Sequence, residues 1–101
     1  MQDPESQDPR INVVGPAESI PVYNCPIIIS RLDNGQLHGQ VASLDGIESQ
    51  ATTEREVLEQ IVSQFKKAIG RYLQAGVEIP WVDPARAPVS GQVERHIPVH
   101  L

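Results

Sequence analysis

A stripe of apolar residues at helical spacing constrains the fold of this chain more than any other feature. Between residues 54 and 74, apolar side chains recur at steps of one and three residues. They are Val57, Leu58, Ile61, Val62, Phe65, Ala68, Ile69, Tyr72 and Leu73. Such spacing traces one face of an α-helix, with polar residues on the other face. Because there is a single stripe, we expect one partner surface, a sheet, and a core that uses the stripe completely.

Both ends of this predicted helix carry recognisable signals. Thr53 suits the N-cap, and Glu56 three residues later completes a capping-box pattern. Gly76 suits the left-handed position that follows a helix. The helix is therefore predicted over residues 54–74.

Three strands are predicted before the helix. The β-branched run Ile27–Ile29 begins a strand that reaches about Arg31. Asn34-Gly35 then predicts a two-residue type I′ hairpin turn. The second strand is expected over residues 36–43 and the third over 47–51, with a turn at Leu44-Asp45-Gly46 between them.

The region after the helix predicts a last strand. Residues 77–82 are expected to be extended and residues 83–91 to form a loop. Residues 92–101 alternate between apolar and polar side chains. Pro98 has no N–H group, so its backbone should face away from the neighbouring strand or lie at a sheet edge. The predicted fold class is α+β, in the order β-β-β-α-β, with one long helix packed on a small, mainly antiparallel sheet.

The N-terminal residues 1–24 are predicted to be largely disordered or irregular, and residues 25–101 to form the domain. Residues 1–10 are polar and contain two prolines. Residues 11–14 suit a short strand, but Gly15, Pro16 and Pro21 interrupt the run. A core this small is marginally stable alone, so we expect a homodimer or a higher oligomer.

Composition limits the classes of partner. The net charge of −5 disfavours direct binding to nucleic acid and favours a basic protein partner. Cys25 is the only cysteine, so an intramolecular disulfide is excluded. The sequence shows neither a signal-peptide pattern nor an apolar run that would span a bilayer, so we expect a cytoplasmic protein without membrane contact.

The residues able to do chemistry do not form a recognisable catalytic pattern. His96 and His100 are four apart on a strand, which is too distant for one ion. Cys25 has no base near it in the sequence. Asp33, Asp45, Glu48 and Glu56 fall in separate turns, a short strand and the helix cap. We therefore predict no enzyme activity, no metal and no cofactor; a weak nuclease site using Asp33, Asp45 and Glu48 is a minor alternative.

Several local patterns together resemble the HicB-like antitoxin domain. The chain has an aliphatic first strand (Pro26–Ile29), an Asp33-Asn34-Gly35 turn, a second turn at residues 42–46, and the helix entry at residues 51–58. The Ile-Pro step at Ile79-Pro80 and the closing strand at residues 96–101 complete the resemblance. Two details differ: the second turn lacks the family's prolines, and Ala51 stands in place of a glycine.

The resemblance implies a fold related to part of the RNase H fold, without its catalysis. It also implies binding to a basic, HicA-like toxin RNase and masking of the toxin's active site. Here the domain would stand alone, lacking a DNA-binding domain. The implied protein-binding residues are in the second turn and near the tryptophan: Leu44, Asp45, Ile47, Glu48 and Trp81. Trp81 is expected either to cap the core or to act as an interface anchor. The alternative function is a self-associating module that has lost its toxin, using an exposed sheet edge.

Overall fold

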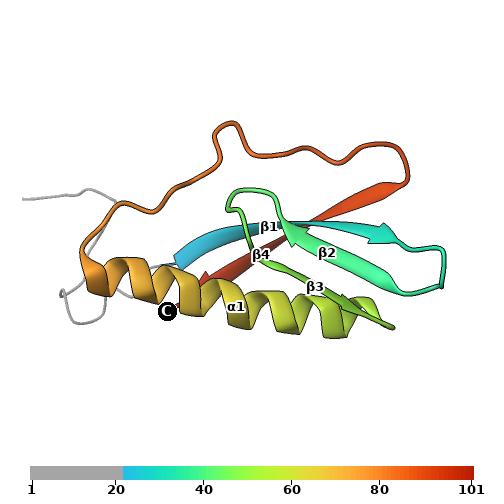
Figure 1. Ribbon diagram of the computed structural model, residues 1–101, viewed down its shortest axis with the longest axis horizontal. Helices are drawn as coiled ribbons and strands as arrows, with labels where there is room; N and C mark the ends of the chain where they lie inside the picture. The colour runs from blue at the N-terminus through green and yellow to red at the C-terminus, as the bar shows by residue number, and fades with distance from the viewer. Residues whose placement is uncertain (1–21) are drawn as a thin grey trace, which may run out of the picture.

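The computed structural model describes residues 22–101 and confirms the predicted class and element order (Figure 1). The elements are β1 (Val22–Arg31), β2 (Leu37–Val41), β3 (Glu48–Ala51), α1 (Glu54–Ala75) and β4 (Gln92–His100). The strands form one sheet in the order β3-β2-β1-β4, and every neighbouring pair is antiparallel. The helix packs on one face of this sheet.

β1 begins three residues before the predicted start of the domain at Cys25. The added residues of β1 pair with β4, since Val22 lies opposite His100 and Asn24 lies opposite Pro98. The rest of the predicted irregular segment, residues 1–21, lies outside the described residues. So do the predicted disordered tail and the short strand at residues 11–14.

The hairpin between β1 and β2 forms where Asn34-Gly35 predicted it, but its turn is one residue longer. Leu32 N–H donates to the Gln36 carbonyl at 2.8 Å, and Gly35 N–H donates to the Leu32 carbonyl at 3.0 Å. The loop therefore contains Asp33, Asn34 and Gly35, which is a three-residue connection with glycine in the left-handed region at φ 86°. The prediction of a two-residue type I′ turn was wrong. The Asn34 side chain explains the longer turn, because its Oδ1 accepts from Gln36 N–H at 2.9 Å.

Helix α1 begins and ends at the predicted caps. Thr53 has extended dihedral angles, and its hydroxyl accepts from Glu56 N–H at 3.2 Å. The Glu56 carboxylate accepts from the hydroxyl groups of Thr52 and Thr53 at 3.1 and 3.2 Å. Gly76 ends the helix at φ 70°, and its N–H donates to the Leu73 carbonyl.

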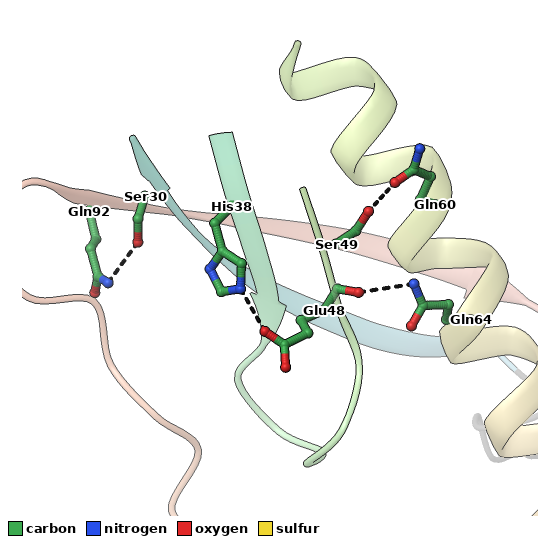
Figure 2. A network of polar contacts seen from close by, with 7 residues as sticks. All are labelled: Ser30, His38, Glu48, Ser49, Gln60, Gln64 and Gln92. Atoms are coloured by element: carbon green, nitrogen blue, oxygen red, sulfur yellow. Dashed lines mark hydrogen bonds and ion pairs between the residues drawn. The ribbon is translucent and has the colours of Figure 1, made fainter. Parts of the chain in front are cut away.

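The helix is displaced toward the β2–β3 side of the sheet. Gly39 in β2 lets it approach closely, since a Cβ atom there would lie 2.5 Å from Val57 Cγ1 and 2.8 Å from Ile61 Cδ1. Figure 2 shows two glutamines of α1 reaching β3. Gln64 Nε2 donates to the Glu48 carbonyl at 3.0 Å, and Gln60 accepts from the Ser49 hydroxyl. The outer edge of β3 is thus partly covered by the helix.

The core lies between the helix and the sheet. Its buried members come from all layers: Cys25, Ile27, Ile29, Val41, Leu44, Ile47, Val57, Ile61, Phe65, Ala68, Ile69 and Val99. The expectation that the core uses the whole helical stripe was wrong. Leu58 and Val62 are only half-buried, and Leu73 is 48% exposed. Because the helix sits over β2 and β3, the flank of its stripe that faces β4 stays partly open.

Residues 77–91 lead from the helix back to β4 along the side of the sheet away from α1 (Figure 1). Two backbone hydrogen bonds attach this segment to the end of β2: Val82 N–H donates to the Ser43 carbonyl at 2.8 Å, and Arg86 N–H donates to the Ala42 carbonyl at 2.9 Å. Figure 2 shows the far end, where Gln92 Nε2 donates to the Ser30 hydroxyl at 2.8 Å. In the described part of the chain, no helix combines the length and apolarity needed to cross a membrane.

Candidate protein-binding surfaces

The five predicted binding residues divide between the core and the surface. Leu44 and Ile47 are 3% and 6% exposed and belong to the core. Asp45 and Glu48 point outward, with side chains 71% and 64% exposed. Of these four residues, only the two carboxylates are therefore available to a partner in this conformation, while the apolar pair holds the second turn and the start of β3 on the core.

The turn and the segment after the helix meet in space. Asp45 forms an ion pair with Arg86, and Glu48 Oε1 lies 2.7 Å from His38 Nε2 (Figure 2). Asp45, Glu48 and Arg86 line a polar hollow of about 180 Å³. Its lining residues are Gln40, Val41, Leu44, Asp45, Gly46, Ile47, Glu48 and Arg86. Sequence reasoning missed Arg86, because it comes from a loop 41 residues away along the chain.

Trp81 packs against the core, as one of the two roles considered for it requires, and it remains partly exposed. Its ring centroid lies 6.2 Å from that of Tyr23 and 6.3 Å from that of Phe65, both in tilted geometry. It thus closes one end of the core while remaining 41% exposed. The hydrogen bond from Val82 to Ser43 places the Trp81 segment beside the predicted turn. The two parts of the predicted site are therefore neighbours.

A second surface lies where α1 leaves the β4 side of the sheet uncovered. Leu58, Val62 and Ile97 line an almost wholly apolar groove of about 340 Å³, rimmed by Glu59 and Ser63. The sequence did hold a signal for this surface. Leu58 and Val62 are four residues apart, and each directly follows one of the buried residues Val57 and Ile61. The apolar stripe is therefore wider than the row of residues that packs on the sheet.

Strand β4 continues this apolar surface toward the N-terminal end of α1. Val93 is 43% exposed, and with Arg95 it lines a further hollow of about 250 Å³ beside Ile29 and Leu37. Arg95 Nε donates to the Glu54 carboxylate at 2.9 Å and separates this hollow from the groove at Ile97. The helix-facing side of β4 thus presents an exposed Val93 and a half-buried Ile97, with the Arg95–Glu54 ion pair between them.

The backbone of β4 has an open edge. Among residues 22–101, β4 pairs with β1 and with no other strand. Ala42 N–H donates to the Pro26 carbonyl, which places the even-numbered residues of β1 in hydrogen-bonding register with β2. The odd-numbered residues of β1 therefore face β4, where their partners are also odd-numbered. The backbone groups of Glu94, His96, Pro98 and His100 consequently point outward. Pro98 faces away from β1, as its missing donor predicted.

The ionisable groups supply little reactive chemistry. Burial raises the pKa of the Cys25 thiol to about 12, and the side chain is fully buried. His96 contacts Asn24 and Glu94 at 3.3 and 3.6 Å. Within residues 22–101, His, Cys, Asp and Glu side chains do not gather in groups of three that could hold a metal ion. Asp33 and Asp45 occupy turns at opposite ends of β2, so they do not share a site.

Comparison with known proteins adds no assignment. No protein-family model, curated protein or solved structure matches this chain. The HicB-like resemblance of the sequence therefore stays a prediction.

Proposed function

We propose that this chain is a non-catalytic protein-binding module whose partner is a basic protein. In the form that the HicB-like resemblance suggests, the partner is a HicA-like toxin RNase, and binding masks its active site. The observation that carries the proposal is the junction of the second turn with the Trp81 segment. It presents an exposed aromatic ring next to outward-pointing carboxylates.

The composition of this junction suits a basic partner. Tryptophan is among the residues that contribute most to binding at protein interfaces, especially when it is held in place. Trp81 is held by Tyr23 and Phe65, so fixing its ring on binding costs little conformational entropy. Exposed Asp45, Glu48, Glu78 and Asp83 lie in or beside the same two segments. Arg86 offsets only the charge of Asp45, so the surface is negative. Complementary charge accelerates association and selects among partners.

The test is rescue of growth arrest caused by a basic, HicA-like toxin encoded beside this chain's gene. Co-expression should restore growth, and calorimetry should detect a direct complex. The double variant Asp45→Lys/Glu48→Lys should weaken binding at least tenfold at low salt, and less at high salt, because screening reduces the contribution of surface charge. Trp81→Ala should weaken it at both salt concentrations.

Two variants serve as controls. Trp81→Phe keeps an aromatic ring on Tyr23 and Phe65 and should retain most of the affinity. Glu59→Lys changes the same kind of charge on the distant α1–β4 groove and should leave binding unchanged. Wild-type affinity in both the charge-reversed and the Trp81→Ala variants would place the partner elsewhere, and failure to bind or rescue would remove the antitoxin role.

A further inference from the structure

We infer that the outer edge of β4 is a self-association surface, at which two copies join their sheets antiparallel around a two-fold axis through Arg95. The inference concerns a second copy of this chain and does not depend on the antitoxin proposal. It is based on three independent properties of the strand: its outward backbone groups, the side chains on its two faces, and the position of Pro98.

The outward backbone groups limit the possible registers to those that pair even-numbered residues with each other. In an antiparallel pair, residues whose N–H and C=O groups face each other form a hydrogen-bonded pair. On the open edge of β4 these are the even-numbered residues. Centring the two-fold axis on Arg95 places Glu94 opposite His96 of the second copy, and His96 opposite Glu94. Each such pair exchanges two hydrogen bonds, so this register forms four.

The side chains match in the same register. On the face away from α1, Glu94 comes opposite the second copy's His96, an acid opposite a base. On the helix-facing side, Val93 comes opposite the second copy's Ile97, at the closer, non-hydrogen-bonded spacing. Each Val93 would then extend the apolar groove that Leu58, Val62 and Ile97 leave open. Opposed apolar and oppositely charged pairs are the contacts that stabilise antiparallel strands.

One contact in this register is like-charged, and the structure compensates for it. Arg95 lies opposite itself on the axis. Each Arg95, however, already donates to its own Glu54 at 2.9 Å and, through a second guanidinium nitrogen, at 3.5 Å. Two neutralised pairs meet at the axis instead of two bare guanidinium groups.

Pro98 limits the length of the pairing. The next hydrogen-bonded pair beyond the central four bonds would join Gln92 to Pro98 of the second copy. Pro98 has no N–H to donate, and Gln92 N–H already donates to the Val89 carbonyl at 2.9 Å. The hydrogen-bonded pairing is therefore limited to residues 94–96 of each copy. An eight-stranded sheet of defined register results, since each copy contributes four strands.

The decisive experiment is disulfide cross-linking of a single cysteine on the axis. In a non-hydrogen-bonded antiparallel pair the Cα atoms are about 4.5 Å apart, within the range that a disulfide spans. Arg95→Cys should therefore form a covalent dimer under mild oxidation. Glu94→Cys is the matched control. In this register, position 94 of one copy lies opposite His96 of the second copy and two residues along the strand from position 94 of that copy. The Glu94→Cys variant should therefore cross-link at least tenfold more slowly. Native Cys25 is fully buried and does not compete.

Light scattering on the wild-type chain tests association without mutation. We expect twice the chain mass, and Ile97→Lys should halve it while circular dichroism shows the fold retained. A wild-type monomer at high micromolar concentration overturns the inference. A dimer in which Arg95→Cys cross-links no faster than Glu94→Cys overturns the register and the edge. Should Ile97→Lys not fold, Val93→Lys tests the same contact from the other side.

Discussion

Gly39 offers the sharpest test of how the helix is seated. The residue lies in β2 directly under α1, and a Cβ atom on it would come within 2.5 Å of Val57 Cγ1 and 2.8 Å of Ile61 Cδ1. Carbon atoms in contact normally lie about 3.5–4.0 Å apart. Gly39→Ala thus requires the helix to lift or the two side chains to move by roughly 1 Å.

The expected cost follows from which atoms have to move. Ile61 Cδ1 ends a flexible side chain, but Val57 is β-branched and has one strongly preferred rotamer in a helix. Both side chains are fully buried, so no open space receives them. Overpacking a core by one methyl group costs typically 1–3 kcal/mol, and the stiffness of Val57 places Gly39→Ala in the upper half, at about 2–3 kcal/mol. At about 4–8 °C per kcal/mol for a domain of this size, Tm should fall by at least roughly 8 °C.

Urea denaturation at one fixed protein concentration measures this cost, because association makes stability concentration-dependent. Gly70→Ala is the matched control: nothing lies within 4 Å of its Cβ position in α1. The same substitution there should stabilise the chain by about 0.5–1 kcal/mol, through helix propensity. Adding Val57→Ala to Gly39→Ala should cost less than the sum of the two changes. A Gly39→Ala variant as stable as the wild type would refute the close seating of the helix.

Three further results are expected. Thr53→Ala should lower the free energy of unfolding by about 1 kcal/mol through loss of the N-cap, whereas Thr53→Ser should not, and urea denaturation distinguishes them. Cys25 should react with a thiol reagent at pH 8 far more slowly in the folded chain than in urea, since it is buried; equal rates would show that β1 is not where the structure has it. Because burial raises the pKa of Cys25 from 9.0 to about 12, the unfolded chain loses this proton first. Stability should therefore fall as pH rises from about 9 to 12, and more steeply than in Cys25→Ala, as pH-dependent denaturation would reveal.

The local elements were predictable because each depends on residues close in sequence. Thr53 and Glu56 define the helix start with their own hydrogen bonds, and Gly76 ends the helix through its left-handed conformation. The hairpin at Asn34-Gly35 was located correctly, yet its length was not. That length depends on the Asn34 side chain bonding to Gln36 N–H, which competes with the two-residue turn.

The surfaces were less predictable because they depend on contacts between distant residues. Leu44 and Ile47 were predicted to bind a partner, but their side chains complete the core. Arg86 reaches Asp45 only because backbone hydrogen bonds tie residues 82 and 86 to the end of β2. The width of the apolar stripe at Leu58 and Val62 was visible in the sequence, but its open flank was not, since periodicity gives the direction of a stripe and not the sideways position of the helix over the sheet.

That sideways position links Gly39 to the two surfaces. A glycine in β2 and the two glutamines that reach β3 draw α1 to one side of the sheet. The same displacement covers one outer strand and exposes the flank of Leu58 and Val62 along the other. Edge strands that remain unpaired are usually protected by charged side chains, inward-pointing charges, prolines or bulges. The inward-pointing charge of β4, Arg95, is neutralised by Glu54. Over residues 92–97, β4 carries no lysine, and its proline comes only at position 98, after the segment available for pairing. A strand built in this way, beside an open apolar groove, has the features of an interface and not of a protected edge.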